Sequence, residues 1–274
     1  MRLTVRHQTS YTYSKPITYA IQTLRLSPRP YEGLNVIAWR VRGAARHELP
    51  SFIDGYGNLV HCHTVNHTHD SAIVTVEGEV ETRATDGIIR GAEETLPPLF
   101  FLRTTRLTAV DPAIEDMAQS LPGAGFERLL ALMHGVHARL AYTAGSTQSN
   151  TTAAEALKLG AGVCQDQAHL FIAAARALKV PARYVGGYLW AGSGDENQAS
   201  HAWAEAYLPE FGWIGFDPTN RTQPGEAYIR ASIGLDYWSA APVRGVRRGE
   251  GEEALSVKVK VKDWAAQQQQ QQQQ

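Results

Sequence analysis

One of the two cysteines in this 274-residue chain lies where a thiol nucleophile can form. The segment GAGVCQDQAHLF, residues 160–171, places Cys164 at the predicted start of a helix. Free backbone N–H groups and the helix dipole favour a thiolate at such a position, and the N–H of the cysteine can donate to an oxyanion. A small, buried and inert cysteine fits the same context, so this segment alone leaves both interpretations open.

A thiol nucleophile needs a base, and His201 is the candidate among the ten histidines. It opens the predicted strand HAWAEAYL. Strand alternation puts four polar or aromatic side chains on one face and alanines on the other: His201, Trp203, Glu205 and Tyr207. Such a face beside small residues favours a cleft.

The base in turn needs an acceptor that fixes its tautomer and stabilises the imidazolium. Asp217 ends the predicted strand GWIGFD, and the short link PEFG joins this strand to that of His201 in a predicted hairpin. Antiparallel pairing then brings the carboxylate beside the imidazole. We therefore predict a catalytic Cys164–His201–Asp217 triad.

Other residues near Cys164 have plainer interpretations. Asp166 and Gln165 lie in the first helical turn, where a capping role is favoured over catalysis. His169 is five residues beyond the cysteine, on a different helix face, and is predicted to pack or to form a hydrogen bond. The hydroxyl of Tyr142 either contributes to an oxyanion site or belongs to a core anchor. The polar segment 190–200 is expected to form the rim of a cleft.

The histidine-rich segment HCHTVNHTH, residues 61–69, suggests a metal site. Its spacing matches no closed zinc pattern, so an exposed strand and loop is favoured. We predict no metal and no cofactor.

Composition excludes several function classes. With 26 basic and 27 acidic residues the net charge is −1, which provides no field to attract nucleic acid or an anionic membrane. The N-terminus lacks the continuous apolar region of a signal peptide, and no window approaches the roughly 20 apolar residues of a membrane span. Two cysteines form no secreted disulfide framework. These features predict a cytoplasmic protein and leave its oligomeric state open.

The elements that must position the triad fall into two predicted domains of an α+β fold. Residues 1–108 alternate polar and apolar residues between turn residues, which predicts an antiparallel β-sandwich-like domain. Residues 109–250 begin with helical periodicity, with Asp111 and Pro112 as a helix start and a capping box at Thr152, and continue with antiparallel strands. Residues 251–264 predict a C-terminal strand that returns to the first domain, and 265–274 a disordered polyglutamine tail.

Four separated blocks together resemble the bacterial transglutaminase-like family: GVCQDQAHLF, ARYVGGYL, SHAWAEAYLPEFGWIGFDPTN and DYWSAAPVRG. The resemblance implies an N-terminal β domain packed on a papain-like catalytic core, in which Cys164 attacks a carboxamide carbonyl and forms an acyl-thioester. It also suggests partners encoded beside ATP-grasp ligases. Gln167 and Leu235 depart from the usual sequence pattern of the family, and we expect both to line the cleft.

The resulting functional hypothesis is a cysteine-dependent amide-bond enzyme acting on a peptide or protein substrate. Hydrolysis of peptide or isopeptide bonds is favoured, because water competes with amine acceptors. A transamidase that joins glutamine to primary amines is the first alternative. A peptide-binding module without catalysis is the second, and it predicts a damaged triad.

Overall fold

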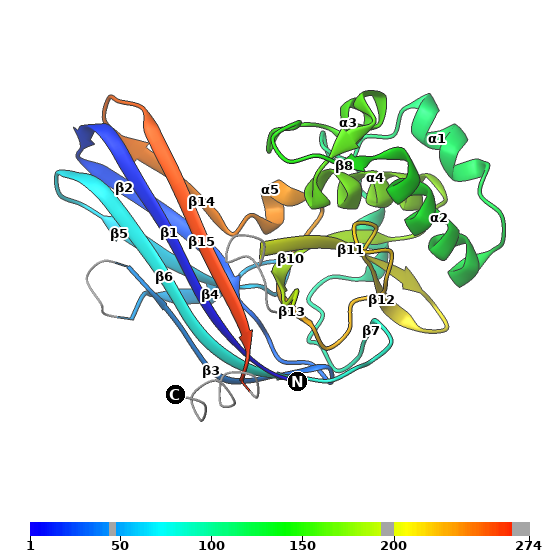
Figure 1. Ribbon diagram of the computed structural model, residues 1–274, viewed down its shortest axis with the longest axis horizontal. Helices are drawn as coiled ribbons and strands as arrows, with labels where there is room; N and C mark the ends of the chain where they lie inside the picture. Colours follow the sequence, from blue (N-terminus) through cyan, green and yellow to red (C-terminus); the bar gives the residue numbers. More distant parts are fainter. Residues whose placement is uncertain (44–47, 193–199, 265–274) are drawn as a thin grey trace.

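The computed structural model describes residues 1–43, 48–192 and 200–264. The predicted polyglutamine tail and most of the predicted cleft rim lie outside these residues. Within them, the α+β fold class is confirmed, with antiparallel sheets at one end of the molecule and a helix-covered sheet at the other (Figure 1).

Two four-stranded antiparallel sheets form the first part. One has the order β15-β1-β6-β3 and the other β14-β2-β5-β4. Their bounds are β1 Arg2–Ile17, β2 Tyr19–Ser27, β3 Leu34–Arg42, β4 Ser51–Ile53, β5 Leu59–Val65, β6 His69–Thr82, β14 Val243–Arg248 and β15 Glu253–Asp263. The last two strands follow the helical part in sequence and return to the outer edges of these sheets, beside β2 and β1.

Alternating apolar residues explain the sandwich. In β1 as far as Tyr13 and in β2 as far as Leu26, every second side chain is buried, as at Leu3, Val5, Leu24 and Leu26, while most intervening residues are polar. Period-two burial of this kind is what packs one face of a strand against another sheet.

The second part is a five-stranded antiparallel sheet of order β13-β10-β11-β12-β7, with α1 to α4 on one side (Figure 1). Its strands are β7 Ile88–Ile89, β10 Ala182–Leu189, β11 Ser200–Leu208, β12 Gly212–Phe216 and β13 Tyr228–Gly234. The helices are η1 Pro98–Leu102, α1 Pro112–Gln119, α2 Gly125–Arg139, α3 Ala153–Leu159, α4 Cys164–Ala177 and α5 Tyr237–Ala240, and β8 Ala141–Tyr142 pairs in parallel with β9 Ala161–Gly162. No helix among the described residues is long and apolar enough to cross a membrane.

Helix α4 is the centre of this part. Nearly all its residues after the first turn are buried, and they pack on the alanines of β11, namely Ala202, Ala204 and Ala206. Small residues on the strand allow the helix to lie close to the sheet. This packing fixes the start of α4 against the start of β11.

The predicted helix signals are confirmed. The Asp111 side chain accepts a hydrogen bond from the backbone N–H of Ile114 at the start of α1, and Thr152 forms a capping box with Glu155 at the start of α3. Gly160 ends α3 in the left-handed region, at φ 68°, which glycine adopts without strain.

Candidate active site

Cys164 is the first residue of α4. The Oδ2 atom of Asp166 accepts hydrogen bonds from the backbone N–H of Val163, at 2.8 Å, and from the Thr147 hydroxyl, at 2.6 Å. The carboxylate is buried, and burial raises the pKa of Asp166 despite these donors. Asp166 therefore holds the helix start in place, in agreement with its predicted capping role.

His201, the first side chain of the predicted strand face, lies beside Asp217. The β11–β12 hairpin predicted from PEFG brings His201 Nε2 to 2.7 Å from Asp217 Oδ2. Because Asp217 occupies Nε2, Nδ1 is the ring nitrogen available to a thiol.

Two residues that the sequence analysis missed help to hold the Asp217 carboxylate. Its Oδ2 also accepts from Asn220 Nδ2 at 2.7 Å and from the Tyr228 hydroxyl at 2.8 Å. Its Oδ1 accepts from the backbone N–H of Thr219 at 2.9 Å. The DPTN sequence, which is typical of a turn around an aspartate, contains a signal for Asn220. Tyr228 comes from β13 and has no local signal.

These contacts determine the charge of the pair. Burial alone would lower the pKa of His201, but its interactions with the Asp217 carboxylate and with Cys164 outweigh this and raise it to about 10. For Asp217, burial would raise the pKa, but the hydrogen bond and charge of His201, with Asn220 and Tyr228, hold it below its usual value. The pair is therefore imidazolium and carboxylate at neutral pH.

Cys164 and His201 line one cavity of about 210 Å³. The core also contributes Tyr184, Gly186 and Tyr237, and the sandwich contributes residues that include Arg25 and Leu26 of β2. The cavity thus lies between the two parts of the chain. The structure brings all three predicted triad residues together. His201 and Asp217 form a direct hydrogen bond, and Cys164 lines the same cavity as His201.

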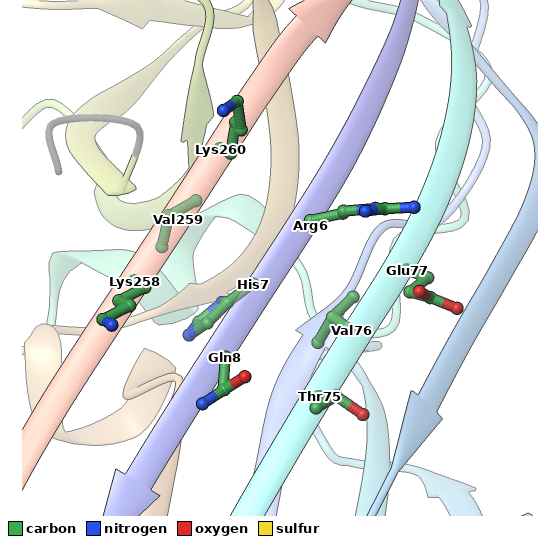
Figure 2. A pocket seen from close by; sticks show the side chains of 9 residues that line it. All are labelled: Arg6, His7, Gln8, Thr75, Val76, Glu77, Lys258, Val259 and Lys260. Atoms are coloured by element: carbon green, nitrogen blue, oxygen red, sulfur yellow. The ribbon is translucent and has the colours of Figure 1, made fainter. Parts of the chain in front are cut away.

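A larger hollow of about 310 Å³ lies on the sandwich and shares one lining residue, His7, with the Cys164 cavity. Figure 2 shows its nine lining side chains, three each from β15, β1 and β6, and none of them belongs to the predicted triad. Volume alone therefore does not locate the chemistry. The hydrogen-bonded His201–Asp217 pair beside Cys164 marks the smaller cavity as the candidate active site.

The rest of the predicted strand face is not a cleft. Trp203 is 1% exposed and packs edge-on against Tyr228, with ring centroids 5.4 Å apart. Glu205 is fully buried and forms ion pairs with Arg183 and Arg230. Only the His201 end of the face opens into the cavity, so the interpretation of the whole face was wrong.

The expectation for Gln167 and Leu235 was also wrong, since neither lines the cavity. Gln167 is 1% exposed; it donates to the Leu140 carbonyl and accepts from the Thr219 hydroxyl, at 2.9 and 2.7 Å. It thus ties α4 to the turn that holds Asp217. Leu235 packs in an aromatic cluster with Phe101.

His169 and Tyr142 have different environments. His169 is fully buried, its Nε2 accepts from the backbone N–H of Tyr237 at 3.0 Å, and burial lowers its pKa to about 4. This agrees with its predicted structural role. Tyr142 is 57% exposed, and its pKa is raised by partial burial and by the nearby Cys164. It is therefore not a core anchor.

The histidine-rich segment runs from β5 into the start of β6. His63 is buried and bonded to Gln22, and His69 Nδ1 lies 2.7 Å from the His67 carbonyl. Across the described residues, no group of three or more potential ligands from His, Cys, Asp and Glu could hold a metal ion.

Comparison with known proteins places these features in a family. Residues 3–81 match the bacterial transglutaminase-like N-terminal region, and residues 115–218 match the transglutaminase-like superfamily. An uncharacterized protein of Mycobacterium leprae is 30% identical over 281 residues, which cover 95% of this chain and 98% of that protein. The chain belongs to the bacterial transglutaminase-like family. An uncharacterized protein of Mycobacterium tuberculosis is 29% identical over 282 residues, covering 93% of this chain and 90% of that protein.

A solved structure shares the whole architecture of this family member. It is a candidate cysteine protease from Cytophaga hutchinsonii, 22% identical, with a TM-score of 0.77 over 96% of this chain and 91% of that one. The likeness therefore extends over both the sandwich and the helical core.

Proposed function

We propose that this protein is a cysteine-dependent amide-bond enzyme that uses Cys164 as nucleophile, His201 as base and Asp217 as the residue that orients the base. The observation that carries the proposal is the 2.7 Å contact between His201 and Asp217, with Cys164 on the same cavity. A thiol, an imidazole and a carboxylate in this order are the groups that acyl transfer requires.

In the proposed reaction His201 holds the proton taken from the Cys164 thiol, and the resulting thiolate attacks an amide carbonyl. The tetrahedral oxyanion accepts from the backbone N–H of Cys164, which lies at the N-terminus of α4. The His201 imidazolium then gives its proton to the leaving amine, and an acyl-thioester remains. Asp217 keeps the ring oriented and stabilises its charge, and water activated by His201 releases the acid.

Hydrolysis of a peptide or isopeptide bond is the favoured outcome. The C. hutchinsonii protein that shares the fold is described as a candidate protease, and water needs no second binding site. A cytoplasmic setting belongs to the same proposal, because such compartments keep thiols reduced and both Cys62 and Cys164 are unpaired.

Differential alkylation tests the nucleophile. Cys62 and Cys164 are both partly exposed, so Cys62 serves as an internal control. We expect iodoacetamide to label Cys164 faster than Cys62. This labelling should occur at a pH well below the usual thiol pKa of about 8.5. The His201→Ala variant should lose most of this advantage. Equal labelling of both thiols at every pH would contradict the proposal and favour a non-catalytic binding module.

Partitioning of the acyl-enzyme tests the reaction type. Peptidyl aminomethylcoumarin amides are incubated with and without dansylcadaverine, and free acid and dansylated product are both measured. Hydrolysis predicts that free acid dominates at millimolar amine. Faster amine incorporation would instead identify a transamidase.

A further inference from the structure

Arg25 brings a permanent positive charge from the sandwich to the cavity that holds Cys164. It belongs to β2, and it lines the cavity with Cys164 and His201. Its side chain is only 15% exposed. No motif in the sequence pointed to a role for this arginine.

The guanidinium of Arg25 is held in place from behind. Its Nε donates to Asp54 Oδ2 at 2.9 Å. Asp54 is the second residue of the turn segment IDGYGN, residues 53–58, and its Oδ1 accepts from the backbone N–H groups of Tyr56 and Asn58, both at 3.0 Å. Asp54 is thus a fixed part of the turn, and Arg25 does not need to become ordered when a ligand binds.

The same turn is attached to the catalytic core. Asn58 Nδ2 donates to the Ile233 carbonyl, and the Ile233 N–H donates to Asn58 Oδ1, both at 2.8 Å. Ile233 belongs to β13, which pairs with β10 on the cavity side of the core sheet. This double hydrogen bond ties the Arg25–Asp54 unit to the sheet that carries His201.

The outer edge of the Arg25 guanidinium retains donors. Nη1 has one long contact, 3.5 Å, with the Thr23 hydroxyl. Within the described part of the chain, Nη2 has no hydrogen-bond acceptor. Arg25 lines the cavity, so these donors are available to a ligand that accepts hydrogen bonds.

The rest of the lining favours an anionic ligand. Among the described residues that line the cavity, none is acidic. The His201 imidazolium is the other charged group in this lining, and burial lowers the pKa of His7 to about 4, so His7 is uncharged. Low polarity around an ionic group strengthens its attraction for an opposite charge.

We propose that Arg25 forms a subsite for a carboxylate on the acyl half of the substrate. This inference rests on the proposed function and narrows it to amides whose acyl group carries a carboxylate a short distance from the scissile carbonyl. The planar outer edge of a guanidinium matches a carboxylate with two parallel hydrogen bonds. The apolar floor beside Leu26 accepts the intervening carbon chain. The N-terminal domain then determines specificity, and the core supplies the nucleophile.

Matched alkylating agents test the subsite without any need for turnover. N-iodoacetyl derivatives of glycine, β-alanine and 4-aminobutyrate are compared with their terminal carboxamides, which have the same shape and no charge. The rate of modification of Cys164 is measured by peptide mass spectrometry, with Cys62 as internal reference. The acid-to-amide rate ratio for each pair cancels the intrinsic reactivity of the thiol.

For at least one chain length, we expect this ratio to be about tenfold higher in the wild type than in Arg25→Gln. Arg25→Lys, which keeps the charge but not the planar fork, should fall between them. Arg40→Gln, on the exposed face of β3, should match the wild type. Equal ratios in wild type and Arg25→Gln for all three pairs would overturn the proposal.

Two further results separate the possible failures. If every reagent labels Cys164 no faster than Cys62, the proposed function fails, whatever the ratios are. If Arg25→Gln does not fold, a protection experiment on the wild-type protein tests the subsite. Succinate and glutarate should slow the alkylation of Cys164 by neutral iodoacetamide more than their diamides do. Equal protection by the acids and the diamides would overturn the carboxylate subsite.

Discussion

Strand β11 carries two ionisable side chains four residues apart on the same face, and they differ in what surrounds them. His201 bonds to Asp217 on one side and opens to the cavity on the other. Glu205 is enclosed, with Arg183 at 2.6 Å and Arg230 at 2.7 Å. The sequence pattern treated both as parts of one cleft face.

The two sites differ in whether other groups of the protein satisfy all the charges. Burial would raise the pKa of Glu205, but the two arginines outweigh it and lower the pKa to about 2. Arg183 in turn bonds to Glu94 and lies 3.8 Å over the Trp213 ring. Every charge there is matched within the protein, so the network has little to offer a ligand. A buried ionic pair becomes a functional candidate where one side still faces a cavity.

Asp217→Asn should cause the largest change in function. The amide would favour the wrong tautomer of His201 and would not stabilise its positive charge, and the loss in serine triads is about 10⁴-fold. The measurement is kcat/KM on an aminomethylcoumarin peptide that the wild type cleaves, with the fold checked by denaturant unfolding. Turnover near that of the wild type would remove Asp217 from the mechanism.

Glu205→Gln should cause the largest change in stability. It leaves two buried guanidinium groups without their shared carboxylate, a change that costs about 3–5 kcal/mol in comparable cases. Urea denaturation gives the free energy of unfolding. Glu253→Gln is the matched control, because its pair with Arg247 is partly exposed and 3.5 Å long, and we expect a loss of at most about 1 kcal/mol. Equal effects of the two variants would contradict the contrast between the two sites.

A third buried ionisable group, His169, should show a smaller, pH-dependent effect. Its pKa is lowered to about 4 in the folded protein, whereas an unfolded histidine titrates near 6.5. Between these values the unfolded state binds more protons. The contribution of His169 to stability is therefore fully present above about pH 6.5 and is lost as pH falls towards 4, with a slope of at most about 1.4 kcal/mol per pH unit.

The pH dependence of unfolding checks this expectation. His169→Gln retains an acceptor for the Tyr237 N–H and should flatten the slope between pH 6.5 and 4. His134→Gln, at an exposed position of α2, should leave the slope unchanged. If the slope of His169→Gln equals that of the wild type, protonation of His169 does not limit acid stability.

Local signals explain which elements the sequence predicted well. Asp111, Thr152 and Gly160 act through hydrogen bonds and backbone angles within a few residues, so their positions in the sequence suffice to predict helix ends. The β11–β12 hairpin is local as well, and it brings Asp217 to His201. No local pattern predicts three further contacts, because the residues involved are 11 to 139 positions apart in the sequence. They join Tyr228 to Asp217, Gln167 to Thr219, and Arg25 to the cavity of Cys164.

The sequence by itself determined the two-part α+β architecture, the start of helix α4 at Cys164 and the hairpin that pairs His201 with Asp217. Each of these depends on periodicity or on residues near one another in the chain. The tertiary structure alone decided that Glu205 is enclosed by arginines, that Gln167 is buried and that Arg25 meets the cavity of Cys164. These outcomes depend on which strands and turns pack together. Burial and charge pairing are properties of that packing, whereas helix capping depends on neighbouring residues.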